Sequence, residues 1–184
     1  MTPRSSAALF IYALTLNVLV GQSQSPPRQP TPPEPPSAVV TFYSSSGAAH
    51  ALKGMLPGYK YGPFSGGIFD GKHLLSQIIP SYFVTFTLPP GPHIFSASVD
   101  GYAPSKLSHF EVNLVADRQY FFRIDQQMII PPVGMPGTYR GIIEQTPCAD
   151  AAKDNAKAKP LKPKHILPDA LQLAVADTSF PTCP

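Results

Sequence analysis

The sequence lacks the short motifs of the common enzyme chemistries. It contains neither the Gly-x-Ser-x-Gly signature of serine hydrolases nor a glycine-rich phosphate loop. Acidic residues number only 11, and those in the apolar region are spread over separate segments, so a glycosidase pair would depend on folding alone. We therefore predict no catalytic residue, with a hydrolase whose site forms only in the tertiary structure as an alternative.

Patterns for metal, cofactor or nucleic-acid binding are equally scarce. The five histidines do not recur at the short spacings of metal motifs, and the two cysteines do not complete a zinc site. The formal net charge of +3 is small and scattered along the chain, whereas nucleic-acid binding requires a concentrated basic surface. We predict no metal, no cofactor and no nucleic-acid partner.

Long apolar runs are absent except near the amino terminus. Residues 7–20 form one such run, and Gly21 and Ser23 are small residues at the positions that a signal peptidase inspects. We predict a signal peptide over residues 1–23, export to the periplasm or the medium, and no stable membrane insertion after cleavage. An uncleaved N-terminal anchor helix is the alternative, although the run is shorter than the ~20 apolar residues of a span.

Proline is the residue that the chain has in excess. There are 24 prolines in 184 residues, well above the average of about 5%, and many of them crowd residues 24–37. Such a segment favours polyproline II and cannot supply the amide donors of a helix or a sheet. We predict an extended linker there, and a ligand for proline-recognition domains is the alternative.

The region from residue 38 to 147 is rich in β-branched and aromatic residues, which occur in short runs separated by turn-forming residues. Most connections between the runs are short, which favours antiparallel neighbours. We predict an all-β fold, an antiparallel β-sandwich of seven or eight short strands. The strands are expected at 38–44, 67–70, 82–88, 93–99, 109–115, 119–125 and 138–145, with a possible further one at 73–79.

Two turn motifs and a period-two pattern indicate how these strands are arranged. Asp70-Gly71 and Pro89-Pro90-Gly91 are hairpin signals, the first suited to a type I′ turn and the second to a type II turn. Alternation along residues 82–88 and 109–115 predicts one apolar face on each strand. We expect these two faces to meet in the core.

The connection at residues 44–67 is much longer than a median loop. Tyr59, Tyr61 and Phe64 stand there in a Gly/Pro-rich frame, where aromatic side chains can stack on sugar rings or anchor a peptide. These three are the candidate ligand-binding residues. The alternative is that they cap an open end of the sandwich, with a short helix at residues 48–55 above them.

The chain has only two cysteines, Cys148 and Cys183. In an oxidising compartment each has one possible partner within the monomer, so we predict a disulfide that closes the tail, residues 148–184. Free or intermolecular thiols are the alternative. The chain-entropy model assigns such a bridge about 4 kcal/mol. Within the tail, residues 149–159 favour a helix, and residues 167–175 carry apolar side chains that could add a strand or dock as a helix.

The turn motifs belong to a longer pattern, in which Phe-Asp-Gly-Lys is followed by Tyr-Phe and by Leu-Pro-Pro-Gly-x-His-x-Phe-x-Ala. This pattern resembles the bacterial uncharacterised-domain family 2846 and, more distantly, PEGA-like β-sandwich domains of exported proteins. It covers about residues 38–160, and its motifs mostly encode turns. The matching residues are Phe69, Asp70, Gly71, Lys72, Tyr82, Phe83, Leu88, Pro89, Pro90, Gly91, His93, Phe95, Ala97, Ala116, Asp117 and Gln119 to Arg123.

One departure from that family concerns the anchor. Its members are often lipoproteins, whereas Gln22 stands here where an acylated cysteine would have to be. The resemblance implies an exported envelope domain without a lipid anchor. We therefore expect a non-catalytic binding or structural module of the bacterial cell envelope, with a polypeptide or glycan component as partner. A carbohydrate- or peptide-binding domain that uses the aromatic residues 59–64 is the alternative.

Overall fold

The computed structural model describes residues 36–44, 59–99, 108–129, 138–176 and 179–183, with the backbone alone at 59–62 and 129. All of them belong to one compact unit, Pro35–Pro184, and the unit Met1–Glu34 lies outside the described residues. The elements are β1 (Ala38–Tyr43), β2 (Tyr59–Pro63), β3 (Gly66–Asp70), β4 (His73–Ile78), β5 (Tyr82–Leu88), β6 (Gly91–Ser98), β7 (His109–Leu114), β8 (Gln119–Ile129), β9 (Thr138–Gln145), α1 (Cys148–Asp154), β10 (Lys159–Pro160), η3 (Pro163–His165) and α2 (Pro168–Leu171).

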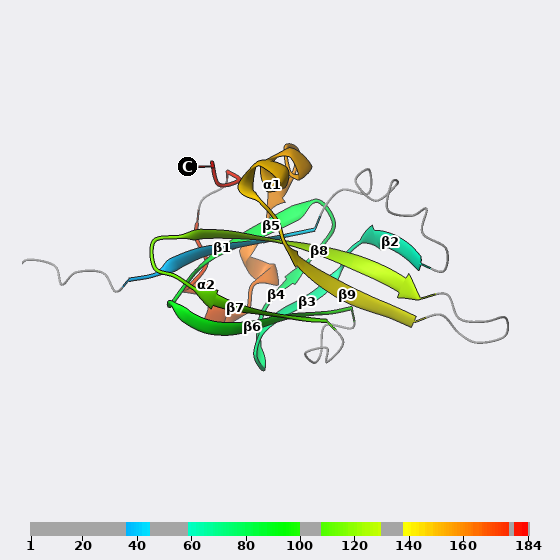
Figure 1. Ribbon diagram of the computed structural model, residues 1–184, viewed down its shortest axis with the longest axis horizontal. Helices are drawn as coiled ribbons and strands as arrows, with labels where there is room; N and C mark the ends of the chain where they lie inside the picture. The colour runs from blue at the N-terminus through cyan, green and yellow to red at the C-terminus, as the bar shows by residue number, and fades with distance from the viewer. Residues whose placement is uncertain (1–35, 45–58, 100–107, 130–137, 177–178, 184) are drawn as a thin grey trace, which may run out of the picture. The chain divides into compact units, whose positions relative to one another are not determined.

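These strands form the two sheets of a sandwich (Figure 1). The first sheet has the order β10-β5-β1-β8-β2, with β9 also paired to β8, and the second has the order β4-β3-β6-β7. Most pairs are antiparallel, but β1 runs parallel to β8 and β10 runs parallel to β5. The prediction of an all-β sandwich is confirmed. One strand, β2, lies inside the segment that the sequence predicts to be a loop, and the helix expected at residues 48–55 lies outside the described residues.

The link between β5 and β6 crosses from one sheet to the other. β5 pairs with β1, whereas β6 pairs with β3 and β7, so the strands that flank Pro89-Pro90-Gly91 are not neighbours in a ladder. Gly91 has a φ of +131°, far from the value of about +80° in a type II turn. The prediction of a type II hairpin turn at this link is therefore wrong.

The other turn motif does close a hairpin, between β3 and β4. Asp70 pairs with His73, which leaves Gly71 and Lys72 as the loop. Gly71 has a φ of +56°, and Lys72 is not among the described residues with positive φ. A type I′ turn needs positive φ at both central residues, so the prediction of type I′ is wrong. A positive φ at the first central position only, with glycine there, is typical of type II′.

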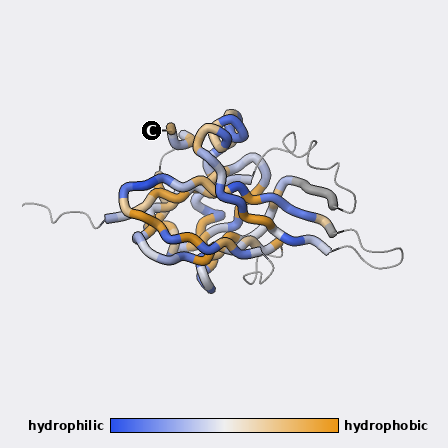
Figure 2. The backbone as a smooth tube through the Cα atoms, viewed as in Figure 1, coloured by the Kyte–Doolittle hydropathy of each residue, from blue (hydrophilic) through white to orange (hydrophobic). Residues whose placement is uncertain are grey.

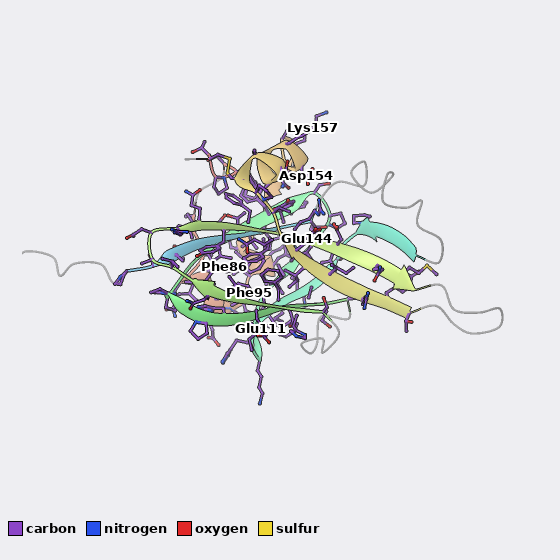
Figure 3. All side chains as sticks on the ribbon, viewed as in Figure 1. Phe86, Phe95, Glu111, Glu144, Asp154 and Lys157 are labelled. Atoms are coloured by element: carbon purple, nitrogen blue, oxygen red, sulfur yellow. A yellow bond between two sulfur atoms is a disulfide. The ribbon has the colours of Figure 1, made fainter. Side chains whose placement is uncertain are left out.

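The core lies between the sheets. The rings of Phe42, Phe95 and Phe122 meet there, with centroids 4.9 Å apart for Phe42 and Phe95 and 5.3 Å apart for Phe95 and Phe122. Figure 3 shows Phe86 and Phe95 between the two sheets, and in Figure 2 hydrophobic stretches recur along the strands that enclose them. The predicted apolar faces of residues 82–88 and 109–115 both contribute to this core.

A second cluster covers the outer face of the first sheet. Tyr43, Phe83 and Phe121 come from the neighbouring strands β1, β5 and β8, and they pack against Ala151 of α1 and Phe180 of the tail. The Phe180 ring lies 5.2 Å from that of Phe83 and 5.8 Å from that of Phe121, measured between centroids. Both faces of β5 are therefore buried, because the tail folds back over the sheet.

Candidate functional site

The tail covers the edge of β5 at two separate places. The Leu161 N–H donates to the Phe83 carbonyl oxygen at 2.7 Å, next to β10. Further along, the Val175 N–H donates to the Thr85 carbonyl oxygen at 2.9 Å, and the Thr87 N–H donates to the Leu173 carbonyl oxygen at 2.7 Å. The chain between these two contacts leaves the edge of β5.

On this excursion the tail reaches the other sheet. Ile166 forms an antiparallel bridge with Ser76 of β4, and the Leu167 N–H donates to the Leu75 carbonyl oxygen at 3.1 Å. η3 and α2 lie on this part of the chain. The tail thus connects the β5 edge of one sheet with the β4 edge of the other, and backbone hydrogen bonds hold it at both ends.

A cavity of about 480 Å³ lies where the tail leaves β5. We call it the tail pocket. Its volume falls within the range of about 300–1,000 Å³ that is typical of small-molecule sites. Apolar side chains from β5 and from the tail make up most of its lining, chief among them Val84, Leu161, Ile166, Leu171, Ala174 and Val175.

Two large apolar side chains at the tail pocket face solvent. Leu171 is 45% exposed and Val175 is 39% exposed, although the same lining includes the buried residues Val84 and Leu161. The other large hydrophobic residues of comparable exposure in the described chain are Ile94, Val115 and Tyr139, on other elements. A ligand in the pocket would remove Leu171 and Val175 from water together, and this burial of apolar surface would contribute favourably to the free energy of binding.

Polar groups in the tail pocket are few. The Thr85 hydroxyl is already engaged, since its oxygen lies 3.0 Å from that of Thr41. Lys162 is exposed and forms no ion pair with any residue that the structure describes. Among the described residues of the lining there is no carboxylate, imidazole or thiol. This arrangement suits the binding of an apolar group.

The disulfide holds the end of the tail. Cys148 at the start of α1 is bonded to Cys183, as the two-cysteine sequence predicts, and Figure 1 shows the C-terminal end beside α1. Phe180, three residues before Cys183, packs into the outer cluster. The bridge therefore fixes the segment that covers the outer face of the first sheet.

A charged network ties α1 to the same face. The Arg123 guanidinium of β8 lies 3.2 Å from Asp125 Oδ2 and 3.4 Å from Asp154 Oδ2, and it donates to Glu144 of β9. Burial lowers the pKa of Arg123, but the Asp125 carboxylate and Glu144 outweigh it and raise the pKa above its ordinary value. The guanidinium is consequently a permanent positive charge that joins β8, β9 and α1.

Tyr43, in the outer cluster, provides a pH-dependent test of this packing. Burial raises its pKa to about 12, and Asp154 adds to the effect against the opposing hydrogen bond with Thr146. Because the folded-state pKa exceeds the ordinary value of 10.0, the stability contributed by neutral Tyr43 is complete below pH 10 and is lost as the pH rises toward 12. Spectrophotometric titration should show a late-titrating component that is lost in Tyr43→Phe and retained in Tyr139→Phe. A titration that is unchanged in Tyr43→Phe would contradict this.

His93 and Asp70 form a close pair of a histidine and a carboxylate. His93 Nδ1 lies 2.7 Å from Asp70 Oδ2, and Nε2 lies 3.0 Å from the Pro89 carbonyl oxygen. The ring also stacks on Phe95, with centroids 5.6 Å apart. Since both nitrogens are engaged within the protein, the pair ties the β3 turn to the link between the sheets. The Asp-Gly-Lys and Pro-Pro-Gly-x-His motifs thus meet in space as parts of one structural contact.

Of the aromatic residues predicted to bind a ligand, Phe64 is the one whose side chain the structure describes, and it is not part of the described lining of the tail pocket. Phe64 is fully buried. Its N–H donates to the Ser44 hydroxyl oxygen, and the Ser44 hydroxyl donates to the Phe64 carbonyl oxygen, each at 2.9 Å. Its ring covers the core, which is one of the two roles that the sequence leaves open. Tyr59 and Tyr61 lie on β2, and their side chains lie outside the described residues.

Sequence reasoning missed the residues of the tail pocket. Leu171, Val175 and Lys162 all belong to the tail, whose apolar residues at 167–175 predict only that this segment docks. The signal that could have located the site is the pairing of that apolar run with the unpaired edge of a strand. The partner strand cannot be identified without the three-dimensional structure.

Comparisons with known proteins identify no family or related structure for this chain. No protein-family model, no curated protein and no solved structure matches this chain. Within the described ranges, no group of three or more His, Cys, Asp or Glu residues is placed to hold a metal ion. No helix in the same ranges is long and apolar enough to cross a membrane.

Proposed function

We propose that this protein is a non-catalytic, exported module of the cell envelope that binds a small apolar ligand in the tail pocket. The observation that carries the proposal is the convergence of exposed Leu171 and Val175 on an apolar cavity of about 480 Å³. Exposed apolar side chains that gather at one concave site are more typical of a binding surface than of scattered surface residues.

The tail pocket is built on ordered backbone, which supports a binding role. Its walls are β5, which pairs with β1 over six residues, and a tail segment bonded to both sheets. A pocket formed in advance spares the ligand the cost of ordering the protein. The described lining holds no carboxylate, imidazole or thiol, and this favours binding over catalysis.

Export and an envelope location rest on two further observations. A disulfide between Cys148 and Cys183 is typical of proteins that fold in an oxidising compartment. The apolar run of residues 7–20 and the small residues after it favour a signal peptide, and the resemblance to envelope β-sandwich domains agrees with both. The proline-rich residues 24–37 would then act as a spacer between the domain and the remainder of the envelope.

A neutral probe tests binding directly. Nile red carries no charge, and its emission rises in apolar surroundings. We expect one probe to bind per chain, and the double variant Leu171→Gln/Val175→Thr to weaken binding by about tenfold, because two partly buried side chains contribute on the order of 1.4 kcal/mol or more. Fluorescence titration at constant pH gives the dissociation constants.

Ile94→Thr is the matched control. Ile94 is 49% exposed, as much as Leu171, but it lies on β6 in the other sheet. Its replacement should leave the dissociation constant within about twofold of the parent value. Equal weakening by both changes, or no saturable binding of Nile red to the parent protein, would refute the proposed function.

A further inference from the structure

The described lining of the tail pocket carries one charged side chain. It belongs to Lys162, which is exposed to solvent. Lys159, three residues before it, and Lys164, two residues after it, are also exposed. None of these three lysines forms an ion pair with any residue that the structure describes. The apolar cavity is therefore lined by one ammonium group, that of Lys162, which has no ion-pair partner within the described chain.

We infer that the ligand is an amphipathic monocarboxylate, with its hydrocarbon chain in the tail pocket and its carboxylate at the Lys162 ammonium. This assignment rests on the proposed function and names the chemical class of its ligand. The hydrocarbon chain packs against Val84, Leu161 and Leu171, while the carboxylate stays at the mouth, where both charges keep part of their hydration. Charge complementarity selects an anion, because a cationic head group would face the ammonium without compensation.

The two halves of such a ligand contribute differently. Each methylene that enters the cavity should improve affinity by about fourfold until the cavity is full. An ion pair at an exposed site is weaker and is screened by salt. We therefore expect the carboxylate to raise affinity by about three- to fivefold over a neutral head group, and this preference to decline as ionic strength rises.

The test displaces Nile red from the full chain with three ligands of equal chain length, namely decanoate, 1-decanol and decyltrimethylammonium. Decanoate should displace the probe at about three- to fivefold lower concentration than decanol, and the cation should be the weakest. In Lys162→Gln, decanoate and decanol should become equal within about twofold. In the control Lys153→Gln, which removes the same charge from α1, the preference for decanoate should remain.

The outcomes separate this inference from the proposed function. If Nile red binds at the tail pocket but decanol displaces it as well as decanoate, the carboxylate assignment is wrong and the apolar site stands. Equal loss of preference in Lys162→Gln and Lys153→Gln would also overturn the assignment, since net charge alone would then explain it. If the protein sediments with phosphatidylcholine vesicles and dispersed decanoate does not displace Nile red, the assignment of a free carboxylate is wrong and the ligand is a membrane surface.

Discussion

Gly66→Ala should lower the free energy of unfolding by about 3 kcal/mol. A Cβ at this position would lie 2.2 Å from the Ser98 carbonyl oxygen and 2.8 Å from Cζ of Phe64. The oxygen belongs to β6, whose Ser98 pairs with Gly67 of β3, and Phe64 is fully buried. Neither atom can move without disturbing the sheet or the core. Urea unfolding of the oxidised protein should give a lower midpoint with an unchanged slope.

Gly71→Ala is the control for this prediction. Gly71 has a φ of +56°, but nothing lies within 4 Å of a Cβ built there. The free energy of unfolding of the alanine variant should therefore fall only by the strain of the left-handed conformation, about 1 kcal/mol. If Gly66→Ala were no more destabilising than Gly71→Ala, the close approach of β3 to Ser98 would not be a constraint on the fold.

The same reasoning explains why Phe64 is a core residue. Its ring lies close to the positions that side chains at Gly66 and Gly141 would take, with Cε2 2.9 Å from a Cβ at Gly141. Two glycines from β3 and β9 thus leave the space that the ring fills. The sequence shows Phe64 in a Gly/Pro-rich segment, which is equally compatible with an exposed aromatic site. The distinction depends on Gly141, which is far away in the chain.

The strands were predictable because their signals are local. Runs such as residues 82–88 and 109–115 combine β-branched and aromatic residues with period-two alternation, and turn residues mark their ends. The strand β2 was not predictable in the same way, because Tyr59–Pro63 contains glycine and proline and is a strand only through its pairing with residues 125–129 of β8. Long-range pairing supplies what local propensity lacks.

Sheet membership was harder to predict than strand position. The sequence around Pro89-Pro90-Gly91 suits a tight connection, and the structure has one, but it passes from one sheet to the other. His93 stabilises this crossing through Asp70 and the Pro89 carbonyl oxygen. A motif that mostly encodes turns indicates where the chain bends, whereas the pairing partners are set by the whole core.

The candidate site was not predictable for a related reason. Period-two alternation places Val84 and Phe86 in the core and Phe83 and Thr85 on the opposite face, and the structure agrees. The tail then covers that opposite face, so Phe83 is only 2% exposed. Because nothing in the pattern of β5 reveals this second cover, neither the outer cluster nor the tail pocket can be found from strand periodicity.

Removal of the disulfide in Cys148→Ser/Cys183→Ser should lower the free energy of unfolding by about 3 to 4 kcal/mol. The bridge joins residues 35 positions apart, and the chain-entropy model assigns a loop of that length about 4 kcal/mol. In the folded state the loss is local, because Phe180 depends on the bridge for its place against Tyr43, Phe83 and Phe121. Urea unfolding measures the first effect, and amide hydrogen exchange at residues 179–183 measures the second.

The tail pocket should survive this change at temperatures where the variant is folded. Residues 159–175 are held by backbone hydrogen bonds to β5 and β4, and these do not involve the cysteines. Nile red should accordingly bind the double serine variant within about threefold of the parent affinity, and Phe180→Leu should loosen the outer cluster with a smaller loss of stability. If the serine variant stays folded but loses the probe, then the bridge, and not the pairing of the tail with β5, maintains the pocket.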